Sequence, residues 1–246
     1  MAVFNYKNQT DKFYFFAFWK DDEPRALSVL KPDDVILAVN KAYDDMTPRT
    51  ISGLGLSESK LSKKEKKNEE YSNLKKKKKE LLDALRMSLA KKIIDEVFKK
   101  SKFDDNIHQD LCEFFQNEFS DVITELNTDI CNINQQIKKI ERIDGSKNTY
   151  GKAQKIVNMT MKYLYFFDDA IVYNGSVFTN CHMAIDEYIM KYMDCIGIER
   201  TCKHWSNFNK GTYKEYQTSI RVHCNNNNEI PFIAEFTYWM KGSKII

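Results

Sequence analysis

Residues that interrupt regular structure are scarce in this chain, which holds only 8 glycines and 4 prolines among 246 residues. Glycine and proline are the residues that most often end helices and form turns. A chain with few of them, and with many Lys, Glu, Leu and Ile, favours long helices over a turn-rich sandwich. We therefore predict a mainly all-α fold, with residues 1–246 forming a single helical domain.

Apolar residues recur at helical spacing in several segments, each of which predicts an amphipathic helix. Pro32 marks one helix start and Gly197 one helix end, because proline suits a first turn and glycine suits a C-terminal cap. The segment 231–239 fits either a helix or an edge strand, so short C-terminal strands stay open. The predicted helices cover 32–46, 81–98, 105–119, 121–143, 187–196 and 213–222.

Residues 58–80 contain ten Lys and five Glu but almost no apolar side chains. Such a segment has little apolar area to bury, so it gains little from ordering. We predict an exposed helix or a flexible insertion at 57–80, whose deletion leaves the melting temperature within a few degrees. The run 75–79 is interpreted as a solvated face or as a contact for phosphate groups.

The segment from Tyr150 to Phe167 is apolar on nearly all sides, which is typical of a central, buried helix. Its polar exceptions fall within one sector of about 120° on a helical projection. One narrow stripe of this helix is therefore polar and mostly cationic. It consists of Lys152, Lys155, Asn158 and Lys162.

Asp186 directly precedes the amphipathic segment 187–196. An aspartate in front of a helix accepts hydrogen bonds from the first free backbone N–H groups, a role worth about 1 kcal/mol. The position of Asp186 is thus explained by an N-terminal cap alone, and a catalytic role is the alternative interpretation.

The order of these features resembles the helix-hairpin-helix DNA glycosylases, and the archaeal 8-oxoguanine branch most. In that family a lysine opens a buried helix, and an aspartate some twenty to thirty-odd residues later begins another. Gly151-Lys-Ala-Gln-Lys-Ile-Val157 is similar to the hairpin exit, and Met183-Ala-Ile-Asp-Glu-Tyr-Ile189 is similar to the aspartate segment. The resemblance covers about residues 140–200, roughly a quarter of the chain.

The resemblance implies a catalytic lysine and a catalytic carboxylate. Lys155 matches the nucleophile, with Lys152 as the alternate, and Asp186 matches the carboxylate. The unprotonated lysine would attack the sugar C1′ and form a Schiff base, while the carboxylate stabilises positive charge on the sugar. We expect the two groups to meet at one cleft, about 4–8 Å apart, since both act on one reacting atom.

The expected partner is duplex DNA with one base flipped out of the stack. The resemblance implies contacts with that DNA from Gly151, Lys147, Lys162 and Asn158. Several aromatic residues lie near these positions in the sequence, without one being assigned as the stacking residue. They are Tyr163, Phe166, Phe167, Phe178 and Trp205.

The sequence is also compatible with two other functions. One is a non-enzymatic nucleic-acid-binding protein, of a phage-defence or mobile-element type, with a degenerate form of the same fold. The other is a helical protein-interaction module that never meets DNA. In either case Lys155 and Lys162 would be cations that keep their amines in water while their stems pack.

Other chemistry is disfavoured by missing motifs. The chain has no phosphate-binding Walker loop, no GxGxxG, no GxSxG and no HExxH, and we predict no cofactor. Its cysteines and histidines include no CxxC pair, so we predict no metal. The aromatic cluster 13–19 is too short and too polar for a membrane span, and no secretion signal is recognised, so a cytoplasmic location with reduced thiols is expected.

Overall fold

A computed structural model describes residues 27–46, 62, 68–134, 140–145 and 148–245. Every regular element in these ranges is helical, which confirms the all-α prediction. The segment 231–239, for which the sequence allowed either a helix or an edge strand, forms a helix. The main helices are α2 (Pro32–Met46), α3 (Glu69–Ile93), α4 (Asp105–Asn134), α5 (Tyr150–Leu164), α7 (Glu187–Cys195), α8 (Lys210–Asn226) and α9 (Pro231–Gly242).

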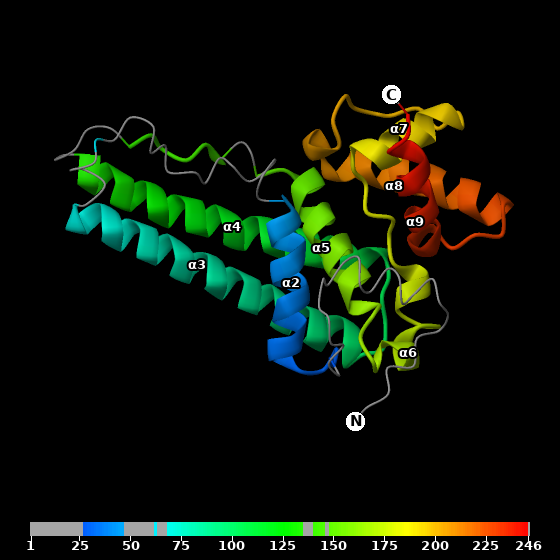
Figure 1. Cartoon of the computed structure of the whole chain (residues 1–246), viewed down its shortest axis with the longest axis horizontal. Helices are drawn as coiled ribbons and strands as arrows, with labels where there is room; N and C mark the ends of the chain where they lie inside the picture. The colour runs from blue at the N-terminus through cyan, green and yellow to red at the C-terminus, as the bar shows by residue number, and fades with distance from the viewer. Residues whose placement is uncertain (1–26, 47–61, 63–67, 135–139, 146–147, 246) are drawn as a thin grey trace.

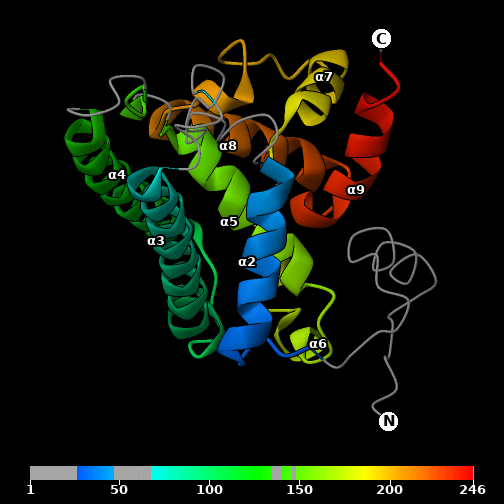
Figure 2. The same cartoon turned by 60° about the vertical axis from the view of Figure 1, so that its left-hand side comes forward.

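Helix α5 lies at the centre of the molecule, as its apolar sequence predicts (Figures 1 and 2). It packs against α2, α4 and α8, and every residue of the helix except Lys152 is buried. The short helix η7 (Trp205–Asn207) covers its first turn. An added Cβ at Gly151 would lie 2.2 Å from the Trp205 carbonyl oxygen, so only glycine permits this approach.

Helices α3 and α4 lie side by side and extend away from the other helices as a long arm (Figure 1). Helix α4 is continuous from Asp105 to Asn134, so the predicted division into two helices near residue 120 is wrong. Phe119, Val122 and Ile123 are all buried on both sides of that point. Packing along α3 therefore outweighs the weak helix propensity of the Ser-Asp pair between them. Residues 140–143, predicted as the end of the helix 121–143, are not helical.

Helix α3 starts inside the Lys-rich segment, at Glu69, where Asn68 accepts hydrogen bonds from the N–H groups of Glu70 and Tyr71. Tyr71 and Leu74 are fully buried, so this part of the segment packs against its neighbours. Lys77 also forms ion pairs with two carboxylates of α4. Most of residues 57–68, like the aromatic cluster 13–19, lies outside the described residues.

Two short elements and one extended stretch connect α5 to α7. After α5 the chain forms α6 (Ala170–Tyr173) and η6 (Phe178–Asn180), and then runs extended to Asp186. Gly197, with φ of +83°, follows the end of α7 and confirms the predicted glycine cap. Among the described residues, no helix has both the length and the apolar character needed to cross a membrane.

The packing of α3 changes the expected result of mutating the Lys-rich segment. Leu74→Ala should lower the free energy of unfolding by about 2–3 kcal/mol, because a buried leucine is replaced by a cavity. Lys79→Ala, at an exposed position of the same helix, should change it by less than about 0.5 kcal/mol. Urea denaturation of both variants measures the difference. Equal stability of the two would show that this part of α3 does not pack.

Candidate active site

The stretch 181–186 runs through the core without helical hydrogen bonds of its own. Residues 181–185 are all buried, so their peptide groups need partners from elsewhere. Side chains from three helices supply partners for three of these groups. Gln217 and Asn158 donate to the Met183 carbonyl (2.6 and 3.4 Å), Gln154 donates to the Ile185 carbonyl (3.3 Å), and the Ala184 N–H donates to Glu235 (2.9 Å).

Asp186 ends this stretch and has three partners. Its Oδ1 accepts from the Ile189 N–H at 3.0 Å, which confirms its predicted role as the cap of α7. Its Oδ2 accepts from the Lys155 ammonium at 3.0 Å. The same oxygen accepts from the Trp239 indole N–H, also at 3.0 Å. The cap and the lysine contact are therefore made by one carboxylate at the same time.

Lys155 and Asp186 are thus brought together from positions 31 residues apart. Their side chains are 11% and 18% exposed, so the pair is near the surface but mostly shielded from water. They are closer than the predicted 4–8 Å and touch directly, instead of facing each other across a space for a reacting atom. Lys155, rather than Lys152, is the lysine that contacts the carboxylate.

The surroundings of Asp186 favour its ionised form. Burial alone would raise the pKa of this carboxyl group, since an apolar environment disfavours charge. The nearby charge of Lys155, the Ile189 N–H, the Lys155 hydrogen bond and the charge of Lys162 outweigh that effect. The pKa of Asp186 is therefore lowered from its ordinary value, and the group is a carboxylate at neutral pH.

A second lysine of α5 forms a more deeply buried ion pair. The Lys162 ammonium lies 2.6 Å from Glu235 Oε1, and the two side chains are only 6% and 1% exposed. The other oxygen of Glu235 accepts the Ala184 N–H. Removing one partner of such a pair typically costs about 3–5 kcal/mol, because the other charge is left buried.

Three of the four residues expected to contact DNA are unsuited to that role. Gly151 donates its N–H to the Phe208 carbonyl and is covered by η7. Asn158 is 1% exposed and Lys162 is 4% exposed, and both use their polar groups inside the protein. Of the polar stripe of α5, Asn158 and Lys162 face the protein interior, whereas Lys152 is not buried. Lys147 lies outside the described residues.

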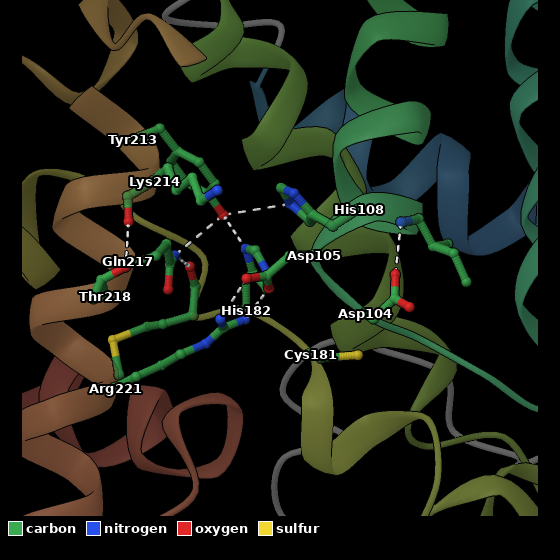
Figure 3. Close-up of polar contacts among 12 residues, drawn as sticks. Asp104, Asp105, His108, Cys181, His182, Tyr213, Lys214, Gln217, Thr218 and Arg221 are labelled. Atoms are coloured by element: carbon green, nitrogen blue, oxygen red, sulfur yellow. Dashed lines mark hydrogen bonds and ion pairs between the residues drawn. The ribbon is translucent and has the colours of Figure 1, made fainter. Parts of the chain in front are cut away.

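Next to Asn158, a buried network joins two histidines through Tyr213 (Figure 3). The Tyr213 hydroxyl lies 2.9 Å from His182 Nδ1 and 3.3 Å from His108 Nε2. The two imidazole rings are stacked, with centroids 3.9 Å apart. His182 Nε2 contacts Asp105, which also pairs with Arg221 through both carboxylate oxygens.

The hydrogen-bond directions in this network follow from a single carbonyl. The Ile185 oxygen can only accept, so Gln154 turns its NH₂ group toward it and its oxygen toward Asn158. Asn158 then directs its own oxygen to His108 Nε2, at 3.0 Å, and this nitrogen must carry the proton. Tyr213 consequently donates to His182 Nδ1, and His182 donates from Nε2 to Asp105.

Both histidines of the network are neutral at physiological pH. Burial lowers the pKa of His108 well below the ordinary value, and the adjacent His182 adds to this effect. Burial also lowers the pKa of His182, although its bond to Asp105 partly opposes the shift. Hydrogen bonds from His182 and Arg221 hold the pKa of Asp105 below its usual range.

Sequence reasoning missed Glu235 and Trp239 of α9. They are four residues apart and so lie on one helix face, which was the available signal. No pattern in the sequence indicated that this face meets α5. Of the aromatic residues named as stacking candidates, Tyr163, Phe166, Phe167 and Phe178 are buried, and only Trp205 is partly exposed. Trp239, the tryptophan that contacts Asp186, is 39% exposed.

Comparison of the chain with protein-family models, curated proteins and solved structures finds no match. The function must therefore be argued from the geometry of the chain itself.

The buried histidines predict a loss of stability in mild acid. As the pH falls through about 6.5, the unfolded chain takes up protons on these imidazoles while the folded protein keeps them neutral. The free energy of unfolding should fall by up to about 1.4 kcal/mol per pH unit for each histidine. Asp105 adds a further loss below about pH 4, where the unfolded carboxyl group protonates first.

Urea denaturation between pH 7.5 and 5 measures this slope, at about half-unit intervals. His182→Gln should reduce the slope, whereas His204→Gln, at an exposed position, should leave it unchanged. An undiminished slope in the His182 variant would contradict the assignment of a neutral, buried His182.

Proposed function

We propose that this protein is a DNA glycosylase with associated lyase activity, which excises a damaged or modified base through a Schiff base on Lys155. The observation that carries the proposal is the contact between Lys155 and Asp186. The sequence resemblance assigned these two residues as nucleophile and carboxylate, and they lie 3.0 Å apart in the structure. Both are held by buried elements, so their geometry is fixed before a substrate arrives.

In the proposed chemistry Lys155 is the nucleophile, and Asp186 both transfers a proton and stabilises charge. The Lys155 nitrogen forms a bond to the sugar C1′ as the bond from C1′ to the base breaks, and the base leaves with a proton. The Lys155 amine must first lose a proton, which the adjacent Asp186 carboxylate is placed to accept and then to pass to the departing base. The sugar ring then opens to an imine, and loss of a C2′ proton expels the 3′ phosphate. Asp186 also stabilises the positive charge that develops on the sugar.

Trp239 belongs to the proposed site because it shares Asp186 Oδ2 with Lys155. Its ring is partly exposed and packs edge-on against Tyr188, with centroids 5.1 Å apart. The indole is therefore in contact with the carboxylate and is itself partly accessible to solvent. Aromatic side chains stack on extruded bases regardless of sequence, so we assign Trp239 as the residue that contacts the flipped base.

A second candidate is a non-enzymatic nucleic-acid-binding or interaction protein. The observation that favours it is the closed arrangement of the pair: both oxygens of Asp186 already accept hydrogen bonds from protein groups. In that case the pair only fastens α5 to α7. The two candidates differ in whether Lys155 can form a covalent bond to DNA.

Borohydride trapping on duplexes that carry a panel of modified bases tests the proposal. Wild-type protein should form a stable covalent adduct with at least one duplex, because borohydride reduces the imine to an amine. Lys155→Ala should abolish the adduct yet bind DNA with similar affinity, since phosphate contacts supply most of that affinity. Lys152→Ala should still form the adduct.

Asp186→Asn separates the cap role from the charge role. Asparagine caps helices about as well as aspartate, so the melting temperature should change little from loss of the cap. Base release should slow by roughly 10²-fold or more, as when an electrostatic stabiliser is removed. If no duplex in the panel traps wild-type protein, the non-enzymatic candidate would lead.

Substitution of Trp239 tests its contact with the base. Trp239→Ala should weaken productive binding of the modified duplex by about 5- to 150-fold, the range expected for loss of one stacked base. Trp239→Phe keeps a ring and should lose less. Trp205→Phe, in η7, serves as the matched tryptophan control. A Trp239→Ala variant with unchanged KM and kcat would exclude the residue from the site.

A further inference from the structure

Lys155 and Lys162 form ion pairs at two different heights along α5. Lys155 pairs with Asp186 at the end of the buried stretch before α7, and Lys162 pairs with Glu235 of α9. Lys155 and Lys162 are seven residues apart on α5, and Glu235 and Trp239 are four apart on α9, so each pair shares one helix face. Lys162 contacts Glu235 at one level. Lys155, Asp186 and Trp239 meet at the other. Helix α9 is therefore joined to Lys162 directly and to Lys155 through Asp186.

We propose that Glu235 and Lys162 are positioning residues for the proposed reaction, because they hold the Ala184 peptide group and thereby place the Asp186 carboxylate against Lys155. The catalytic consequence of this inference rests on the proposed function. The positioning itself concerns the folded protein and is measurable without turnover.

The hydrogen bond from Ala184 carries the argument. Glu235 Oε2 accepts the Ala184 N–H at 2.9 Å, two residues before Asp186. The peptide groups on either side are held by amides, since Asn158 and Gln217 bind the Met183 carbonyl and Gln154 binds the Ile185 carbonyl. Glu235 is thus the acceptor that fixes the middle of the stretch.

Lys162 holds the Glu235 side chain in place through the ion pair to its other carboxylate oxygen. Its ammonium lies 2.6 Å from Glu235 Oε1 and 4.7 Å from the centre of the Phe236 ring. A buried ion pair is often no more stabilising than well-packed apolar side chains of similar size. Stability alone therefore gives little reason for charges at these two positions, whereas fixed placement of the carboxylate oxygen on Ala184 gives a specific one.

If Glu235 positions Asp186, the effect of a substitution at residue 235 depends on whether the Ala184 N–H keeps a hydrogen-bond acceptor. A purely structural role gives no such dependence once the variants are folded. Two double variants remove both charges together, so that no charge is left buried alone. In Lys162→Met/Glu235→Gln, the carbonyl oxygen of the introduced glutamine still accepts the Ala184 N–H. In Lys162→Met/Glu235→Leu, that acceptor is lost. The comparison therefore isolates the hydrogen bond from the ion pair.

The reporter is the Trp239 indole N–H, which donates to Asp186 Oδ2 and so senses the position of this carboxylate. The chain has only three tryptophans, and Trp239→Phe assigns the resonance by its disappearance. In a two-dimensional ¹H–¹⁵N NMR spectrum at neutral pH, the Gln double variant should keep this resonance near its wild-type position. The Leu double variant should shift or broaden it.

Covalent trapping on the modified duplex is then measured at a temperature where both double variants are fully folded. The Gln variant should trap at a rate within about threefold of wild type, and the Leu variant at least tenfold more slowly. A purely structural role predicts equal rates once both proteins are folded. Lys210→Met/Glu113→Gln, which removes an exposed ion pair elsewhere, is the matched control and should change neither readout.

The outcomes are separable from those of the proposed function. If wild-type protein traps no DNA while the Leu variant alone moves the Trp239 resonance, positioning stands and the glycosylase proposal fails. If the Leu variant keeps both the resonance and the trapping rate, the positioning inference is overturned. The inference is also overturned if the Trp239 resonance shifts as far in the Gln double variant as in the Leu double variant. The acceptor for the Ala184 N–H would then make no difference to the position of Asp186.

If both double variants fail to fold, two variants that keep both charges replace them. Lys162→Arg should retain the resonance, and Glu235→Asp, whose shorter side chain withdraws the carboxylate from the Ala184 N–H, should shift it. An unshifted resonance in the Asp variant would overturn the inference.

Discussion

The peptide groups between Cys181 and Asp186 lie in the core with no helix or sheet to pair them, and much of the structure is arranged around that demand. Unpaired buried peptide groups are costly, at about 1–3 kcal/mol each. Helices α5, α8 and α9 each contribute polar side chains that approach this stretch from different directions. The three helices are thereby fixed relative to one another, because one short segment must satisfy polar groups from all of them.

This arrangement explains why most of the polar residues of α5 are buried. Gln154 and Asn158 donate to backbone carbonyls of the stretch. Lys155 pairs with Asp186 at the end of the stretch, and Lys162 pairs with Glu235, which accepts the Ala184 N–H. Buried polar groups of this kind tolerate few alternatives, since each must find a partner with correct geometry. The same demand places an amine and a carboxylate together near the surface.

Part of this site follows from the sequence. The apolar segment around α5 predicts a central helix, Asp186 predicts a helix cap, and both were confirmed. The residues that complete the site did not follow, because a periodic pattern shows which face is polar without showing what that face meets. Glu235 and Trp239 come from a segment whose aromatic residues suit helix and strand equally well. The direction of the α5 stripe was misjudged for the same reason, and Lys162 and Asn158 were assigned to DNA when they face the core.

Local propensity also failed where packing between distant segments decides the outcome. Ser120 and Asp121 resemble a helix boundary, yet α4 continues through them because its apolar residues pack along α3. In the Lys-rich segment, residues 69–80 form a mostly exposed helix, which was one of the predicted alternatives, but Tyr71 and Leu74 are buried. In each case a small number of long-range apolar contacts outweighs the composition of the local sequence.

Hydrogen exchange of the Ala184 amide tests the central claim most directly. This N–H lies outside any helix, so a surface connection at the same position would exchange quickly. The structure instead buries it and pairs it with Glu235. We expect Ala184 to exchange as slowly as amides in the middle of α5, such as Val157, through global unfolding. Exchange as fast as that of Gly175, in the loop before η6, would contradict a core organised around this stretch.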